Sequence, residues 1–383
     1  MTTAPITTRH PGRRWRQFSL RTLLVAMLAF GCGFGWLAHE VQRAREQRQA
    51  AKAIEKLGGS VACEARSSGT TQTAVAWVGK LFGEDLSEDV ELVRLSDTEV
   101  TDAGLEHLRH LTQLETLELD NTQVTDAGLV HLRRLTQLRE LYLSNTQVTD
   151  AGLVHLKGLT QLHELHLTNT PVTDARLAHL RGLTRLEWLD LSRTHVTGAG
   201  LEHLRGLTQL HTLHLKNTQV TDAGLGHLRG LTKLWHLELS STQVTDAGLV
   251  HLRGLAHLRW LKFDSTQVTD AGLAYLRGLG ELQYLWLSGT RVTDAGLEHL
   301  RGLAKLEYLE LNNTAVTDAG LEHLRELTRL RELYLNDTQV TDAGLQHLRG
   351  LTQLRALYLS NTQVTSAGIA ELQKALPNCK ITR

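Results

Sequence analysis

The sequence has few of the residue types that mark several classes of protein. Only 5% of its 383 residues are aromatic, and it contains 3 cysteines and 4 prolines. Three cysteines cannot build a disulfide-stapled fold, and few prolines with 21% charged residues do not describe a disordered chain. Neither charge is in excess, since 41 Lys and Arg balance 41 Asp and Glu. Balanced charge argues against nucleic-acid binding, which needs a basic surface.

The short motifs of common enzymes are also missing. The chain has no Gly-x-Ser-x-Gly elbow, no Gly-Lys-Ser/Thr phosphate loop and no His-Glu-x-x-His pair. The glycines Gly31, Gly33 and Gly35 lie inside an apolar segment with no strand before them, so they are not a nucleotide loop. We therefore predict that the protein is not an enzyme and has no catalytic residue, no cofactor and no metal.

One segment has the length and composition of a membrane anchor. Residues 22–38 are 17 residues without a charge, near the lower limit of about 17–25 for a spanning helix. Trp15 and Trp36 lie near its ends, where interfacial aromatic residues are favoured. A cleaved signal peptide is the alternative, but Trp36 stands where a cleavage site needs a small residue. We predict an uncleaved transmembrane anchor.

The flanking charges bear on the orientation of this anchor. Five arginines precede it and five Lys or Arg residues follow it, which is a tie by the positive-inside count. The N-terminal charges lie closer to the segment, so we expect a single-pass protein of the cell membrane with an extracytoplasmic C-terminal body. Gly31 and Gly35 form a small-xxx-small pair, which favours self-association through the anchor.

Internal repetition covers most of the chain. A threonine recurs every 24 residues from Thr98 to Thr362, and twelve units of constant length fill residues 87–374. Each unit begins with Leu-x-x-Leu-x-Leu, which has the alternation of a strand with one buried face. Val-Thr-Asp-Ala-Gly-Leu then predicts a short helix, with Thr149 as an example of the N-cap and Asp150 in the first turn. One unit cannot cover its own apolar face, so the units must stack.

These units resemble leucine-rich repeat proteins, whose repeats of 20–29 residues combine Leu-x-x-Leu-x-Leu with a short helix. The Val-Thr-Asp-Ala-Gly-Leu step resembles the ribonuclease-inhibitor-like and cysteine-containing branch. In that branch a Cys or Asn usually occupies the repeat position held here by Thr98, Thr122 and their equivalents. We therefore expect the buried hydrogen bonds at this position to join threonine hydroxyls to the backbone. With the anchor, the chain also resembles bacterial membrane-anchored repeat proteins. The resemblance implies an α/β fold: a right-handed solenoid of twelve repeats with a parallel concave sheet and short convex helices.

The chain divides by pattern into five regions. These are a basic segment at 1–21, the anchor at 22–38, a helical stalk and N-terminal cap at 39–86, the solenoid at 87–374 and a C-terminal cap at 375–383. Within the third region we predict a helix that ends at Gly58, a strand over 61–64, a loop over 67–73 and a capping helix over 74–82. Cys63 and Cys379 lie at opposite ends, roughly 50 Å apart by the strand spacing, so they cannot form a disulfide.

Twenty histidines are a high number, and half of them share one repeat column. This column contains His107, His131, His155, His179, His203, His227, His251, His299, His323 and His347. A zinc site needs three or four ligands that converge on one point, which a linear ladder does not supply. We interpret the column as half-buried residues between neighbouring helices, and the aspartates of the repeats as helix-start residues without calcium.

Function is expected where the repeats differ, on the outward positions of the concave strands. The predicted partner-binding residues are Tyr142, Trp188, Trp260, Tyr284, Trp286, Tyr308, Tyr334 and Tyr358, with the polar residues His166, Asp190, His214 and Glu238. Tyrosine and tryptophan combine a large apolar surface with a polar tip, as recognition surfaces require. We predict a protein partner, with a glycan as the alternative. A metal or acid–base cluster of the four polar residues is disfavoured, because side chains on parallel strands point outward in a row.

Two other functions remain open. An intracellular adaptor resembling the substrate-recognition subunits of ubiquitin ligases would share the Thr-Asp-x-Gly-Leu step. No adaptor-binding helical module precedes the repeats, however, and the predicted anchor takes that place. A metalloenzyme on the central concave strands is the other alternative, and it would require metal to copurify with the repeats.

Overall fold

The structure, a computed structural model, describes residues 20–65 and 88–383, without the side chains of residues 20–34, 37, 64, 65 and 88. Most of the basic segment, the loop over 67–73 and the capping helix over 74–82 lie outside the described residues. Helix α1 spans Leu20–Lys56 and strand β1 spans Ser60–Ala65, as predicted. Between them Gly58 has φ +85°, a left-handed conformation that glycine adopts without strain.

The predicted anchor lies within the backbone of α1, but most of its side chains are not described. In the part of the chain that the structure describes, no helix combines the length and apolar character of a membrane span. The transmembrane helix is therefore not supported by the structure and stays a prediction from the sequence.

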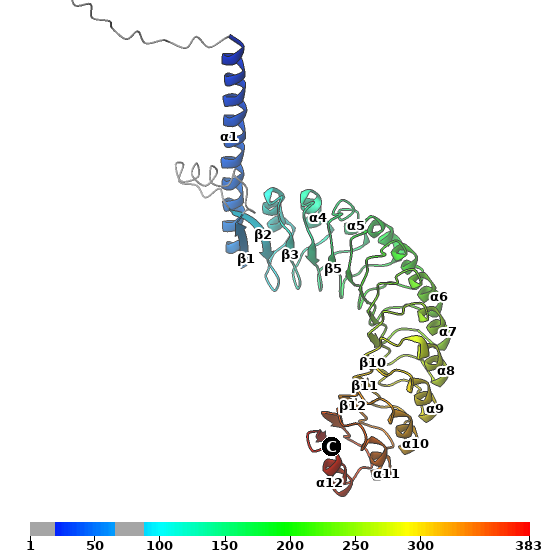
Figure 1. Cartoon of the computed structure of the whole chain (residues 1–383). Helices are drawn as coiled ribbons and strands as arrows, with labels where there is room; N and C mark the ends of the chain where they lie inside the picture. The colour runs from blue at the N-terminus through cyan, green and yellow to red at the C-terminus, as the bar shows by residue number, and fades with distance from the viewer. Residues whose placement is uncertain (1–19, 66–87) are drawn as a thin grey trace, which may run out of the picture. The chain divides into compact units, whose positions relative to one another are not determined.

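The chain divides into two compact units, of which the second contains residues 49–65 and 89–383 and all the repeats. The strands within the described residues form one 14-stranded sheet in chain order, and the repeat strands pair in parallel, with Leu141 opposite Leu165 as an example. The strands after β1 are β2 (Glu88–Arg94), β3 (Thr116–Glu118), β4 (Glu140–Tyr142), β5 (Glu164–His166), β6 (Trp188–Asp190), β7 (Thr212–His214), β8 (His236–Glu238), β9 (Trp260–Lys262), β10 (Tyr284–Trp286), β11 (Tyr308–Glu310), β12 (Glu332–Tyr334), β13 (Ala356–Tyr358) and β14 (Lys380–Thr382). Within this unit the strands line the inner side of an arc and the helices its outer side (Figure 1).

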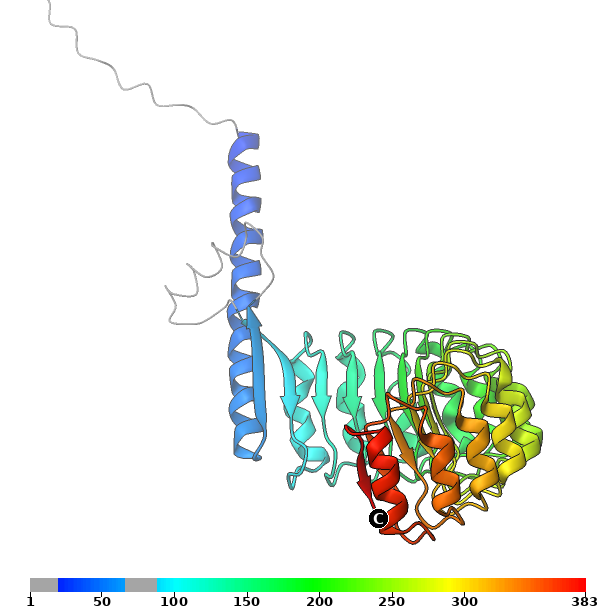
Figure 2. The same cartoon turned by 60° about the horizontal axis from the view of Figure 1, so that its bottom comes forward.

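The convex side consists mainly of single α-helical turns, each followed by a 3-10 turn except after α5. The α-helical turns are α3 (Asp102–Leu105), α4 (Asp126–Leu129), α5 (Asp150–Leu153), α6 (Asp222–Leu225), α7 (Asp246–Leu249), α8 (Asp270–Leu273), α9 (Asp294–Leu297), α10 (Asp318–Leu321) and α11 (Asp342–Leu345). Two repeats have only a 3-10 helix, η3 (Asp174–Gly182) and η4 (Gly200–Leu204). The last repeat ends with the longer α12 (Ser366–Ala375), and strand β14 follows it (Figure 2). The predicted short helices are thus confirmed.

A continuous core of stacked leucines holds the second unit together. In the repeat of β4, the side chains of Leu138, Leu141, Leu143 and Leu153 are all fully buried. The same positions are buried in the neighbouring repeats, so that the core runs without a break from Ala50 to Cys379. Each three-residue strand therefore places its middle leucine inward and its two outer residues on the concave face.

Two polar columns order the backbone of each repeat. The threonine column is buried as predicted: the hydroxyl of Thr146 donates to the carbonyl of Leu143 at 2.7 Å, and the other repeats repeat this bond. At the helix start, Thr149 accepts a hydrogen bond from the backbone amide of Ala151, which confirms its N-cap role.

The aspartate column does more than start helices, because it also joins consecutive repeats. Asp126 accepts the backbone amide of Thr149 at 2.7 Å and the Thr149 hydroxyl at 2.6 Å, across 23 residues. The column is interrupted at Gly198 and ends at Ser366. Opposite Gly198, the Thr221 side chain does not cap α6.

The histidine column is architectural, as predicted. Nine of its ten members are half-buried, and His107 is exposed. An arginine of one repeat donates to the histidine of the next, for example Arg133 Nε to His155 Nδ1 at 2.9 Å. Burial and the neighbouring Arg133 lower the pKa of His155, so the imidazole stays neutral and accepts this bond.

Candidate functional site on the concave face

All twelve predicted partner-binding residues lie on strands β4 to β13 at outward positions. They differ from the prediction in one respect, because they are half-buried or buried rather than exposed. The reason is that side chains at one column of neighbouring strands, about 4.8 Å apart, stack on each other.

Eleven rings form one continuous row along the concave face, which we call the ring file. Its members are Tyr142, His166, Trp188, His214, His236, Trp260, Tyr284, Trp286, Tyr308, Tyr334 and Tyr358. Successive ring centroids are 4.0 to 6.1 Å apart. Most successive rings are stacked or tilted, whereas His214 meets Trp188 and His236 edge-on. The predicted site comprised eight aromatic residues and four polar residues. The structure joins them through His236, which stands in register with Trp260 and was not among the predicted site residues.

Carboxylates beside the ring file fix the tyrosine hydroxyls. Tyr308 Oη donates to Glu310 Oε2 at 2.8 Å, and Tyr334 Oη donates to Glu332 Oε2 at 2.8 Å. Burial and the hydrogen bond to Glu310 raise the pKa of Tyr308, so its hydroxyl remains a donor at physiological pH. The rings are therefore held in place before any partner arrives, which lowers the entropic cost of binding.

The central strands carry the most polar part of the face. His214 Nδ1 lies 3.3 Å from Asp190 Oδ2, and His214 Nε2 lies 3.5 Å from His236 Nδ1. Burial raises the pKa of Asp190, but the hydrogen bonds from His214 and Ser192 outweigh burial and lower that pKa to about 2. Burial, with positive charge at His214 and Lys262, lowers the pKa of His236 to about 3. Asp190 is therefore charged and His236 neutral at physiological pH.

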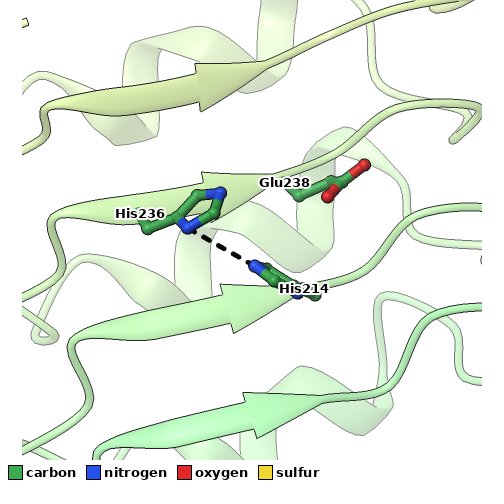
Figure 3. A group of neighbouring side chains, drawn as sticks. All are labelled: His214, His236 and Glu238. Atoms are coloured by element: carbon green, nitrogen blue, oxygen red, sulfur yellow. Dashed lines mark hydrogen bonds between the residues drawn. The ribbon is translucent and has the colours of Figure 1, made fainter. Parts of the chain in front are cut away.

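Three groups on these strands converge, contrary to expectation. A ring nitrogen of His214, a ring nitrogen of His236 and a carboxylate oxygen of Glu238 all lie within 4.8 Å of one another (Figure 3). The expectation failed because His214 and His236 occupy different rows of adjacent strands, so their rings meet diagonally. The four-residue cluster weighed from the sequence does not include His236, and His166 is not part of the group that forms.

A shallow pocket of about 380 Å³ adjoins the ring file at the start of strands β8 to β10. Its lining is His211, Lys233, Trp235, His257, Arg259, Trp260 and Gln283. Lys233 and Arg259 give this pocket a basic lining next to Trp260.

Family patterns match the repeats directly. The pattern described as "Leucine Rich repeats (2 copies)" matches residues 136–179 and 328–374, and the pattern "Leucine rich repeat" matches residues 160–220. The chain is a leucine-rich repeat protein. This family typically supplies recognition scaffolds rather than enzymes.

Solved structures resemble this leucine-rich repeat protein at low sequence identity. An internalin (inlF) from Listeria monocytogenes is 24% identical with a TM-score of 0.62, over 82% of this chain and 94% of that one. An internalin C2 from the same species is 31% identical with a TM-score of 0.42, over 54% and 84%. A leucine-rich repeat protein from Leptospira interrogans is 19% identical with a TM-score of 0.48, over 73% and 80%. No curated protein matches the chain significantly.

Proposed function

We propose that this leucine-rich repeat protein binds a protein partner along the ring file. The observation that carries the proposal is the continuity of the row, which places one ring or two on each of the strands β4 to β13. Aromatic residues at the centre of an interface contribute much of the binding energy when they are already ordered. Here carboxylates hold the Tyr308 and Tyr334 hydroxyls in fixed positions.

The stacking geometry favours a protein over a glycan. Sugars bind aromatic residues by lying against an open ring face. The ring of Tyr334 has Tyr308 on one side at 5.0 Å and Tyr358 on the other at 4.2 Å. Its faces are therefore occupied by its neighbours, and a partner reaches ring edges and polar tips. Such a surface suits side chains and backbone groups of a polypeptide.

Alanine substitution of the ring file tests this function. We expect Trp260→Ala, Trp286→Ala and Tyr308→Ala each to weaken capture of the partner about tenfold or more, as loss of a hot-spot aromatic does. Partner proteins would be identified by crosslinking to the full-length chain, and affinities measured with the purified partner. Tyr275→Ala is the matched control, because Tyr275 stands in the convex histidine column and lies under Arg253. Equal losses for Tyr275→Ala and the concave variants would contradict the assignment.

We further propose that residues 22–38 anchor the chain in the cell membrane with the repeats outside the cytoplasm. The uncharged composition of this segment and the arginines close before it support the proposal. Protease added to intact cells should then digest the repeats, and the protein should stay with the membranes after alkaline washing. Protection of the repeats from the protease would mean that they lie on the cytoplasmic side. Release of the protein by the alkaline wash would contradict the proposed membrane anchor.

A further inference from the structure

We propose that His214, His236 and Glu238 form a Zn²⁺ site on the concave face. Two imidazole nitrogens and one carboxylate oxygen are a ligand set that zinc uses in proteins, with the fourth position left for water or another ligand. The three residues come from only two strands, β7 and β8, so the backbone of a rigid sheet fixes their spacing.

The distance between the two histidines fits a tetrahedral ion. Zinc binds imidazole nitrogen at about 2.0–2.1 Å, so two nitrogens on one tetrahedral zinc lie about 3.3 Å apart. His214 Nε2 and His236 Nδ1 are 3.5 Å apart. A carboxylate oxygen of Glu238 lies within 4.8 Å of a ring nitrogen of each histidine, and the rotatable bonds of the glutamate side chain can close the remaining gap.

The surroundings of His214 orient it as a ligand. Asp190 Oδ2 lies 3.3 Å from His214 Nδ1, at hydrogen-bonding distance. A carboxylate that accepts the Nδ1 hydrogen directs the lone pair of the ring to Nε2, which is the arrangement of carboxylate–histidine–zinc triads. This nitrogen, His214 Nε2, is the one that faces His236 Nδ1.

His236 itself lacks the partners that a buried imidazole needs. Its side chain is only 9% exposed, and among the described residues its Nε2 has no hydrogen-bond partner. The Trp188 Nε1 and Thr212 Oγ1 atoms, in register with it on β6 and β7, are also buried without a partner there. Each unpaired buried polar atom costs about 1–3 kcal/mol. These atoms are not the proposed zinc ligands, because His236 would bind the ion through Nδ1, but a water or anion in the fourth zinc position is the kind of group that pairs with them.

One neighbour opposes a cation at this site. Lys262 Nζ lies 3.8 Å from Glu238 Oε2 and also sits over the Trp286 ring at 4.6 Å. Its positive charge repels a divalent ion and competes with that ion for the Glu238 carboxylate. We therefore expect Lys262→Met, which keeps the contact with Trp286, to tighten zinc binding several-fold. A structural role of Lys262 alone would not produce this gain.

Titration of the full-length, untagged protein with Zn²⁺ tests the site. We expect one tight equivalent in calorimetry after chelator treatment, and the intense visible absorption of four-coordinate Co²⁺ when Co²⁺ replaces Zn²⁺. His236→Gln and Glu238→Gln should each lose this equivalent. Asp190→Asn should weaken zinc binding about 10- to 100-fold, as does loss of a carboxylate that hydrogen-bonds to a metal-binding histidine in other proteins. His227→Gln, in the convex column beside Arg205, is the matched control and should keep it.

Two outcomes would overturn the proposal. The first is a wild-type protein that binds no Zn²⁺ or gives a six-coordinate Co²⁺ spectrum. The second is a tight equivalent that survives both His236→Gln and Glu238→Gln. Unchanged circular dichroism of the variants separates loss of the ligand from loss of the fold. If His236→Gln unfolds, Glu238→Gln still tests the site, because glutamine has the shape of glutamate and lacks its charge.

Discussion

Asp264 is a largely buried carboxylic acid at the end of β9, beside the ring file. Its Oδ1 accepts the backbone amide of Ser288 at 2.9 Å, and its Oδ2 accepts the Ser240 hydroxyl at 3.2 Å. Burial, assisted by the negative charge of Glu310, raises the pKa of Asp264 to about 6. The ionised form is therefore disfavoured in the folded protein, and it becomes the dominant form only near neutral pH.

The raised pKa predicts a pH-dependent gain from Asp264→Asn. Because the folded pKa exceeds the unfolded one, the stability linked to Asp264 is present below about pH 4 and lost as pH rises through about 6. Asparagine does not ionise and can still accept the Ser288 amide. We expect the variant to exceed wild type by about 1–3 kcal/mol at pH 7, with no gain at pH 4.

Urea denaturation at both pH values measures this difference. Asp190→Asn, in metal-free protein, provides a comparison of opposite sign, because the pKa of Asp190 is lowered to about 2. That variant should lose stability at pH 7, and the loss should shrink as pH falls below about 4. A gain for Asp264→Asn that is the same at both pH values would contradict this explanation.

At the scale of elements, the aspartate column clamps each helical turn to the next repeat. Asp126 takes two hydrogen bonds from Thr149, whereas Gly198 offers no carboxylate to Thr221. The chain thus contains a clamped and an unclamped threonine at the same repeat position. Gly198 also lies close to Gly224, where an added Cβ on Gly224 would come within 2.4 Å of the Gly198 Cα.

This pair of threonines predicts unequal costs for one substitution. Thr149→Val removes a hydroxyl that donates to Asp126 and caps α5, so we expect a loss of about 1–3 kcal/mol. The Thr221 hydroxyl has no aspartate opposite it and does not cap α6. Thr221→Val should therefore lower the free energy of unfolding by less than about 1 kcal/mol. Chemical denaturation measures the free energy of unfolding of both variants. Equal losses of stability would mean that the hydrogen bonds to the aspartate contribute nothing.

The elements could be predicted from the sequence because their causes are local. Leucine alternation gives the strands, and threonine followed by aspartate starts the helical turns. The clamp between Asp126 and Thr149 was missed, because it depends on how closely repeats stack. The concave rows were predicted, since they follow from alternation alone. The contact between His214 and His236 was not, because it requires the actual side-chain directions across two strands.

At the scale of the whole molecule, each repeat touches only its neighbours, so repeats are interchangeable parts. Deletion of residues 103–126 removes 24 residues and places Asp102 at the position of Asp126, facing Thr149. We expect this variant to fold cooperatively, with a modest loss of stability. Deletion of residues 103–114 removes half a period and should unfold or aggregate, because strand residues would meet helix residues. Circular dichroism and size-exclusion chromatography distinguish the two results, and equal behaviour would contradict repeat independence.

The aspartate column stops at Ser366, and this has a consequence for how the gene can change. An in-frame gain or loss of one 24-codon unit inside the array leaves every carboxylate opposite a threonine, so recombination can lengthen or shorten the concave face. Thr365 is the last threonine to receive such a carboxylate, from Asp342. A unit added after Ser366 would find none. Growth of the concave face in the interior of the array therefore keeps the clamp, whereas growth after Ser366 would add a repeat without it, as at Gly198 and Thr221.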